Sequence, residues 1–568
     1  MGPMNQMTWI DYTIMISMLM LSSGFGFYHG IKKNRTSSIE EYLFAGRNLP
    51  LIPLIMSNMA SSVSSIAIVA VSTETYYYGG QIIFFSIGQL FGFVCFYFFY
   101  VPVFYELKYT SYFEYLEKRF NRAIRLLGSG VFIICQIILS VTIMYSSCIA
   151  VTKVIPVPFY LLATVLCSIC SIYTFLGGLR GVVWSDFIQA LFMYGSAITI
   201  IVISINNVGG INQVLDIARE GGRLQFLNFD PHPFSRHSSW TLWLAGLCLS
   251  LQIICTNPGI IQRCLAISTY KKVKIVVISS AVAHFALFAT CVLIGLLIYT
   301  NYYNCDPVTS KELTDADQLV THHVLKIGSQ MPGLSGIFLA GILSASLSSL
   351  STTMNSLSGI IFEDFIKTFA PFTLNNARTN LCLKSIVVLL GLIVNAGIFA
   401  MNPSGGLFQT AATLTSIGGG LIIFIISFGL FVRNANIKGV IVGALVGSSV
   451  TLCILIGNVW SVAAGKIKYT PKIVSIEGCV NNISHPFENL TQGFPHHTSV
   501  TFDEDVPYLF RISFSLFAPI GVVVSFIVGY LITICTKHNK NIDENLLIPQ
   551  IRKKMHDYDA VTCKVNDI

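Results

Sequence analysis

Long runs of apolar residues, each followed by a short polar stretch, recur along the whole chain. About thirteen runs reach roughly 20 residues, the length that an α-helix needs to cross the ~30 Å hydrocarbon layer of a bilayer. They begin near Trp9, Pro50, Ile82, Leu126, Val157, Val182, Trp240, Val273, Leu334, Ser385, Gly406, Gly439 and Leu509. The pattern predicts an all-α polytopic membrane protein with about thirteen transmembrane helices.

The second run is interrupted at its middle by hydroxyl groups. Between Pro53 and Ala70 lie the serines Ser57, Ser61, Ser62, Ser64 and Ser65, and a second serine-rich run extends from Gly341 to Ser356. A single serine in a membrane helix commonly packs against a neighbouring helix or bonds back to the i−4 carbonyl. Two dense clusters favour a broken helix whose freed oxygens hold a cation. We expect the two runs to form one cation site together.

The seventh run contains a second predicted break, at Thr256-Asn257-Pro258-Gly259. A proline kink is a sufficient explanation for this stretch taken singly. However, the break lies five spans after the broken second run. Paired breaks at this spacing predict two inverted copies of a five-helix unit, residues 50–205 and 240–432, each opening with a discontinuous helix.

Composition agrees with a membrane protein and excludes several classes of function. Hydrophobic residues make up 53% of the 568 residues, only 11% are charged, and the mean hydropathy is +0.68. Nothing in this composition predicts binding to nucleic acid. The 15 cysteines form no paired CxxC pattern, so a thiolate metal site is not expected. There is no HExxH or GxSxG motif of an enzyme, no arginine-repeat voltage sensor and no TVGYG-like channel filter.

Basic residues predict the topology. Lys32 and Lys33 directly follow the first run, and further lysines and arginines collect in every second loop and in the tail 536–568. Because cytoplasmic loops are enriched in basic residues, the N-terminus, with the first helix in residues 1–31, is expected outside and the C-terminal tail inside.

Two additional helices in residues 437–535 flank a long loop, residues 465–508, that this topology places outside. The loop contains Asn482-Ile-Ser and Asn489-Leu-Thr, two N-glycosylation sequons, which agrees with an extracellular position. Cys305 and Cys479 both fall in outside loops. The sequence leaves open whether they form a disulfide.

Four stretches resemble the sodium/solute symporters, and within that family the branch of sodium-coupled monocarboxylate, multivitamin and iodide transporters. They are VSTETYYYG (71–79), TSYFEYLEKRFNRAIRLLG (110–128), YTFLGGLRGVVWSDFIQ (173–189) and SASLSSLSTTMNSLSGIIFEDFIK (344–367). The resemblance extends over residues 9–535. It implies a LeuT-like fold with a 5+5 inverted repeat, alternating access, Na+ as the co-transported ion without an organic cofactor, and a position in the plasma membrane.

The resemblance also implies which residues bind sodium. The backbone carbonyls of Ala60, Val63 and Ala345 and the hydroxyls of Ser348 and Ser349 would form one site, and these are the oxygen ligands that a hard cation prefers. Members with two sodium ions have a second site nearby. Here that site resembles Ser61, Ser64 and Tyr145, with Ser349 shared, which predicts an electrogenic cycle when one carboxylate accompanies two sodium ions.

The solute pocket implied by the resemblance lies between the two broken helices, near Ser62, Ala67, Tyr145, Asn257 and Gln409. We expect no Lys or Arg at the middle of a span, so an anion would rely on hydroxyls, amides and positive helix ends. This favours a small organic anion, either a monocarboxylate or a vitamin-like carboxylate. Ala67 stands where iodide carriers of the branch have glutamine, and Pro258 stands where most members have glutamine, so iodide is disfavoured and the substrate stays open.

Three alternatives remain: a carrier of iodide or another anion, a carrier of a sugar or polyol, and a sensor of the same fold that binds solute without transport. Asp186 also has two interpretations. The resemblance places it on the inward exit path for sodium, whereas its position after Trp184-Ser185 is equally compatible with a helix start, where carboxylates are favoured.

Overall fold

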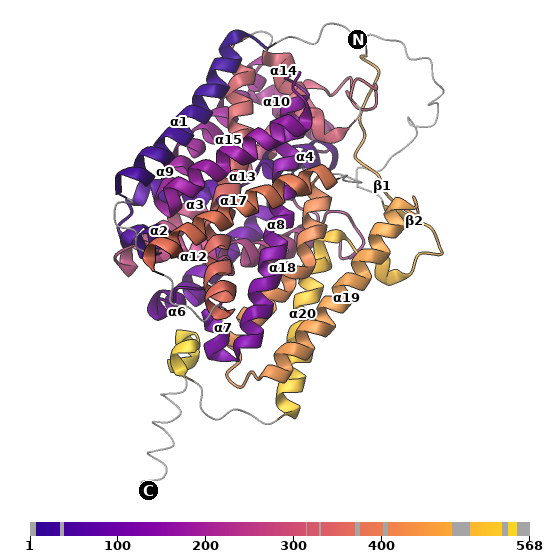
Figure 1. The fold of residues 1–568 in the computed structure, drawn as a ribbon. Helices are drawn as coiled ribbons and strands as arrows, with labels where there is room; N and C mark the ends of the chain where they lie inside the picture. Colours follow the sequence, from indigo (N-terminus) through magenta and orange to yellow (C-terminus); the bar gives the residue numbers. More distant parts are fainter. Residues whose placement is uncertain are drawn as a thin grey trace, which may run out of the picture.

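The structure is a computed structural model that describes residues 7–33, 39–313, 315–328, 331–369, 375–401, 407–479, 500–536 and 543–553. The described part of the chain forms a bundle of long helices (Figure 1). The long and broken helices are α1 (Trp9–Lys33), α3 (Leu51–Ser62), α4 (Ser72–Tyr78), α5 (Ile83–Cys95), α6 (Val101–Leu107), α8 (Arg122–Thr152), α9 (Phe159–Val208), α11 (Ser239–Ser250), α12 (Pro258–Leu265), α13 (Tyr270–Asn301), α15 (Leu334–Ile360), α17 (Asn376–Ala400), α18 (Leu407–Phe431), α19 (Ile437–Ala463) and α20 (Phe517–Cys535).

Shorter elements connect them. These are α2 (Ile39–Phe44), α7 (Glu114–Arg119), α10 (Ile211–Glu220), α14 (Leu319–Gly328), α16 (Lys367–Phe369) and the antiparallel strands β1 (Ile467–Tyr469) and β2 (Val500–Phe502). In the hairpin of β1 and β2, Ile467 pairs with Phe502.

Among the described residues, ten helices are long and apolar enough to cross a membrane, and two bent helix pairs raise this number to twelve. The predicted total of about thirteen stays a prediction. The 50-residue α9 covers the two runs predicted near Val157 and Val182. At about 1.5 Å per residue it is far longer than one crossing requires. It contains a break at Gly178, where φ is 53° and ψ is −159°.

Gly178 is a position at which only glycine fits. Its positive φ is strained for residues with a Cβ atom. A Cβ atom there would also lie 2.9 Å from the Tyr42 ring and 3.0 Å from the Tyr42 carbonyl oxygen. The chain therefore changes direction at Gly178 while staying in close contact with α2.

Both predicted helix breaks are present. The axes of Leu51–Ser62 and Ala67–Tyr78 differ by 64°, and those of Ser239–Cys255 and Pro258–Leu265 differ by 52°. At the first break, Val63 has extended backbone with φ −113° and ψ 111°. At the second, Asn257 Oδ1 accepts a hydrogen bond of 2.9 Å from Gly259 N, and Pro258 lacks the N–H that a continuous helix needs.

The helix that carries the second serine cluster, α15, is at the centre of the bundle. It packs against α1, α3, α8, α9 and α17, and 94% of the apolar stretch within Leu334–Phe369 is buried. Figure 1 shows α19 and α20 side by side along one edge of the bundle, opposite α1 and α9. The serines of α15 are therefore held inside protein rather than exposed to lipid.

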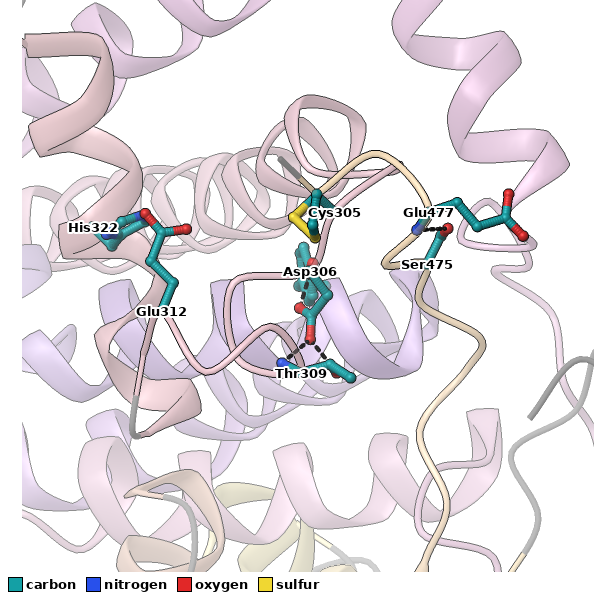
Figure 2. Close-up of a disulfide and its surroundings, with 9 residues drawn as sticks. Cys305, Asp306, Thr309, Glu312, His322, Ser475 and Glu477 are labelled. Carbon is teal, nitrogen blue, oxygen red and sulfur yellow. Dashed lines mark hydrogen bonds and ion pairs between the residues drawn. A yellow bond between two sulfur atoms is a disulfide. The ribbon is translucent and has the colours of Figure 1, made fainter. Parts of the chain in front are cut away.

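A disulfide links the segments that follow α13 and β1 (Figure 2). It joins Cys305, which follows α13, to Cys479, and the two Cα atoms are 5.1 Å apart. Beside it, Asp306 Oδ2 accepts hydrogen bonds from Thr309, and Asp306 Oδ1 accepts one of 2.7 Å from the Tyr76 hydroxyl of α4. The sequons at Asn482 and Asn489 lie outside the described residues.

Candidate sodium and solute site

The predicted sodium ligands lie where the broken helix α3 meets α15. Ser348 Oγ donates a hydrogen bond of 2.8 Å to the Ala60 carbonyl oxygen, and the Ala345 carbonyl oxygen is 3.2 Å away. Ser349 Oγ donates to the same Ala345 carbonyl at 3.0 Å. Val63 lies at the end of α3, where the backbone leaves the helix. Hydroxyls can turn their lone pairs toward a cation, so these oxygens can act as hard-ion ligands.

The residues predicted for a second sodium are only partly brought together. Ser61, Ser64 and Ser349 all line one cavity next to the first set. Tyr145 is not among the described residues that line this cavity, and its ring packs edge-on against Phe159 with centroids 5.3 Å apart.

This cavity has a volume of about 180 Å³ and lies between the two helix breaks. Its walls are mostly apolar, with Phe85, Ile143, Leu249, Phe288 and Phe514 among them. Its polar lining residues are Ser61, Ser62, Ser64, Gln89, Gln136, Gln252, Asn257, His284, Ser349, Thr352, Thr353, Thr415, Ser416 and Ser515. Within the described part of the chain, no Asp, Glu, Lys or Arg lines it.

Three of the five residues predicted for the solute pocket, Ser62, Ala67 and Asn257, line the cavity. Tyr145 and Gln409 do not. Gln409 instead accepts a hydrogen bond of 3.2 Å from an arginine that precedes α11.

A buried ion pair lies directly against one end of the cavity lining. Arg263 of α12 and Asp186 of α9 are both fully buried, with Nη2 and Oδ2 2.9 Å apart. The same Nη2 donates to Thr352 Oγ1 at 2.6 Å and to Ser61 Oγ at 2.9 Å, while Arg263 Nε donates to Ser57 Oγ at 3.0 Å. The pair and its three hydroxyl partners connect α3, α9, α12 and α15.

One expectation about this region is wrong, and one of the two interpretations of Asp186 is excluded. A basic side chain does lie at this level of the bundle, because Arg263 contacts two cavity-lining hydroxyls. Asp186 does not start a helix, since Trp184 and Ser185 before it are helical and α9 continues on both sides. Its carboxylate is instead the counter-charge that a buried guanidinium requires.

Residues 42–447 match the sodium:solute symporter family. The chain belongs to this family. Curated relatives cover nearly its whole length. The mouse (Mus musculus) sodium-coupled monocarboxylate transporter 2 is 30% identical over 95% of this chain and 86% of its own. The human (Homo sapiens) sodium-coupled monocarboxylate transporter 1 is 29% identical over 95% of this chain and 89% of its own length. The rabbit (Oryctolagus cuniculus) sodium-dependent multivitamin transporter is 29% identical over 93% of this chain and 82% of its own length.

Solved structures show the fold of the symporter. A Na+-coupled sialic acid symporter in a substrate-bound outward-open state aligns with a TM-score of 0.75 at 20% identity, covering 94% of this chain and 100% of that chain. A nucleobase-cation-symport-1 family transporter, in a closed conformation with bromovinylhydantoin bound, aligns with a TM-score of 0.53 at 10% identity. The alignment covers 90% of this chain and 99% of that chain. The predicted LeuT-like fold with two inverted repeats is confirmed, and Na+ is the co-transported ion.

A second buried ion cluster of the symporter lies on the other side of the first helix break. It forms around Glu74 of α4, the helix that follows this break. Arg236 Nη2 lies 2.5 Å from Glu74 Oε1 of α4, and His237 Nε2 lies 2.7 Å from Glu74 Oε2. Arg236 is also the partner of Gln409. Burial lowers the pKa of His237, and the adjacent Glu74 carboxylate opposes that shift. The cavity thus lies between two buried ion clusters, one on each side of the first helix break.

Sequence reasoning missed the polar groups that reach the symporter's cavity from other helices: Gln89 of α5, Gln136 of α8, Gln252 before α12, and His284 of α13. Each stands alone in an apolar run, and that isolation was an available signal. Arg263 stands next to Gln262 in an otherwise apolar run, and its charge was a related signal.

Proposed function

We propose that this symporter imports a small organic carboxylate together with sodium across the plasma membrane, with its N-terminus outside and its C-terminus in the cytoplasm. The observation that carries the proposal is the cavity beside the sodium ligands. It is apolar, it offers amide, hydroxyl and imidazole groups, and no fixed charge lines it among the described residues. The names of the monocarboxylate and multivitamin relatives support the same class of solute.

The size of the cavity limits which organic carboxylates fit. A volume of about 180 Å³ is below the range of about 300–1,000 Å³ that is usual for drug-sized ligands. A monocarboxylate of a few carbon atoms fits such a space better than a vitamin does. The apolar walls suit its short hydrocarbon chain, and the amides suit its carboxylate.

Sodium would couple to the solute through the break in α3. In our proposal, Ala60, Val63, Ala345, Ser348 and Ser349 bind the ion and hold α3 against α15. Loss of the ion toward the cytoplasm removes the ligand that holds the two helices together. Sodium thereby favours one conformation through its differential affinity, which is the requirement for coupled transport. A second ion would be held by Ser61, Ser64 and Ser349, with Tyr145 reaching the set in another conformation.

The two ion clusters would alternate as barriers. The Arg263–Asp186 pair ties four helices together next to the cavity. In our proposal, sodium leaves past Asp186. Release requires the hydroxyl and guanidinium contacts of Asp186 to separate. The Glu74–Arg236 contact would have to separate in the opposite half of the cycle.

Uptake by the purified protein in proteoliposomes tests this function. Labelled butyrate and lactate should accumulate under an inward sodium gradient, and accumulation should collapse when choline replaces sodium. Biotin, iodide and glucose serve as competitors, and a Ser348→Ala/Ser349→Ala variant serves as the sodium-blind control. Equal uptake in choline, or competition by glucose but not by carboxylates, would contradict the proposal. Binding of butyrate without accumulation would identify a sensor.

A further inference from the structure

His284 is the one ionisable side chain among the described residues that line the cavity. It lies in the middle of α13 and is 2% exposed. Its two ring nitrogens contact different elements: Nδ1 lies 3.0 Å from Ser62 Oγ of α3, and Nε2 lies 3.2 Å from Gln89 Oε1 of α5. All three residues line the cavity.

The hydrogen-bond partners of the His284 ring determine which of its two nitrogens carries the proton. Gln89 Oε1 is an acceptor, so Nε2 carries the hydrogen and donates to it. In a neutral imidazole, Nδ1 then has the lone pair and accepts from the Ser62 hydroxyl. Ser62 Oγ also lies 2.9 Å from the Met59 carbonyl oxygen. One hydroxyl proton therefore has two alternative acceptors, one inside α3 and one on α13.

Ser62 occupies the position where a link to α13 matters most. It is the last residue of α3, and the extended Val63 follows it. The proposed sodium ligands Ala60 and Val63 lie on either side of it in sequence. A hydrogen bond that fixes Ser62 therefore also restrains the backbone that presents those two carbonyl oxygens.

The surroundings of His284 make a hydrogen bond there strong. The ring faces Phe93, with centroids 5.7 Å apart, and Phe85 and Phe288 line the cavity beside it. The nearest charged groups on the elements around Ser62 are Arg263 and Asp186, which are paired with each other and contact Ser61. In such apolar surroundings, an N–H donor gains more from an anionic acceptor than from an amide oxygen.

We propose that His284 is a specificity-determining residue that binds the solute carboxylate through Nε2–H and transmits this binding to the sodium site through Nδ1 and Ser62. The carboxylate displaces Gln89 as the acceptor. The ring, pinned at its other nitrogen, holds Ser62 and the end of α3 in the sodium-binding geometry. This inference rests on the proposed function, because it requires that the solute has an anionic head group.

Two substitutions of His284 test the roles of its two ring nitrogens separately. The amide of asparagine reaches the position of Nδ1, and the amide of glutamine reaches that of Nε2. His284→Asn should keep the contact to Ser62 but lose the solute donor, which raises the KM for butyrate about ten-fold or more with little change in the sodium dependence. His284→Gln should keep the KM for butyrate within about three-fold and raise the half-saturating sodium concentration instead.

A double-mutant comparison tests the link to α3. Ser62→Ala alone should raise the half-saturating sodium concentration, and adding it to His284→Gln should change little further, because both remove the same contact. Thr290→Val is the matched control on α13, since its hydroxyl donates to Leu287 O of its own helix and, among the described residues, to no other helix. It should leave both constants unchanged. Surface expression and thermal unfolding in detergent, measured for every variant, exclude loss of the fold as the cause.

The outcomes distinguish the inference from the function it rests on. Absence of sodium-driven butyrate uptake by the unmodified protein would overturn the proposed function. Normal uptake by the unmodified protein, together with unchanged constants in folded His284→Asn and His284→Gln, would overturn the inference alone. Equal loss of solute and sodium affinity in both variants would also overturn it, because that pattern indicates a structural role only.

Discussion

The hydroxyl of Ser348 on α15 donates a 2.8 Å hydrogen bond to the carbonyl oxygen of Ala60, which lies 288 residues earlier on the broken helix α3. In a continuous helix this carbonyl would accept the backbone N–H of residue 64. The break frees it, and Ser348 replaces the missing donor. The contact therefore joins two oxygen atoms that can both turn toward a cation once the hydroxyl proton rotates away.

Ser348→Ala should weaken sodium binding while leaving the fold intact. Loss of one oxygen ligand and of the contact to Ala60 should raise the half-saturating sodium concentration about ten-fold, the equivalent of ~1.4 kcal/mol. Sodium should also stabilise the unmodified protein against heat, because it binds only the folded state, and this stabilisation should shrink in the variant. Sodium-activation curves and thermal unfolding with and without sodium measure both effects.

Ser358→Ala is the matched control for Ser348→Ala. Ser358 is fully buried on the same helix, and its hydroxyl bonds to Asn355 of its own helix. It should leave the sodium dependence unchanged. Equal sodium activation of both alanine variants would argue against Ser348 as a ligand.

Arg263 and Asp186 should show strong coupling. Asp186→Asn leaves a buried guanidinium without its counter-charge, a change that costs about 3–5 kcal/mol in buried pairs. Asp186→Asn and Arg263→Gln should each open the side proposed to face the cytoplasm, because they loosen the contacts among four helices. The double variant should be less impaired than either single one. Labelling of a cysteine introduced at Thr353, which lines the cavity next to Thr352, from the proposed cytoplasmic side measures opening. Additive damage in the double variant would contradict the coupling.

The sequence predicted those features of the site that depend on local chemistry. Pro258 cannot donate a backbone hydrogen bond, and the hydroxyls around Ser62 are unfavourable in lipid, so both helix breaks could be located from the residues alone. The pairing of Arg263 with Asp186, 77 residues apart, depends on which helices become neighbours and on how each is rotated. For the same reason, the side chain of His284 could not be assigned to the cavity from its sequence position.

The Cys305–Cys479 disulfide should stabilise the end of the protein that carries it. It connects residues 174 positions apart, and its removal by Cys305→Ser/Cys479→Ser should cost about 2–4 kcal/mol. For a chain of this size, the loss corresponds to a decrease in Tm of about 2–3 °C. Fluorescence-detected thermal unfolding measures it, and the free, exposed Cys453 provides a control as Cys453→Ser.

Transport should partly survive loss of this disulfide, because hydrogen bonds hold the same segment. Asp306 N donates to Ser475 O at 2.8 Å, and Lys472 N donates to Tyr77 O at 2.9 Å. Complete loss of folded protein would show that these contacts are insufficient. No change in Tm would show that the disulfide is absent or that the same segment is held equally well without it.

Gly246→Ala should damage both stability and solute binding. Gly246 of α11 packs directly on α5, where an added Cβ atom would overlap the carbonyl oxygen of Phe85, and Gly88 makes the reciprocal approach to the backbone of Trp243. Because backbone atoms cannot move aside as a flexible side chain can, the two helices would have to separate. Overpacking of this kind costs about 1–3 kcal/mol. Close approach of membrane helices depends on small residues at such positions.

The same separation would move two cavity walls, since Phe85 and Ala245 both line the cavity. We therefore expect Gly246→Ala to lower the Tm and to raise the KM for butyrate together. Gly195→Ala is the control, because nothing lies within 4 Å of a Cβ atom there. Alanine should be tolerated at that position, or should stabilise α9 slightly through its helix propensity, by up to ~1 kcal/mol. Equal behaviour of the two variants would show that the contact between α5 and α11 does not determine the shape of the cavity.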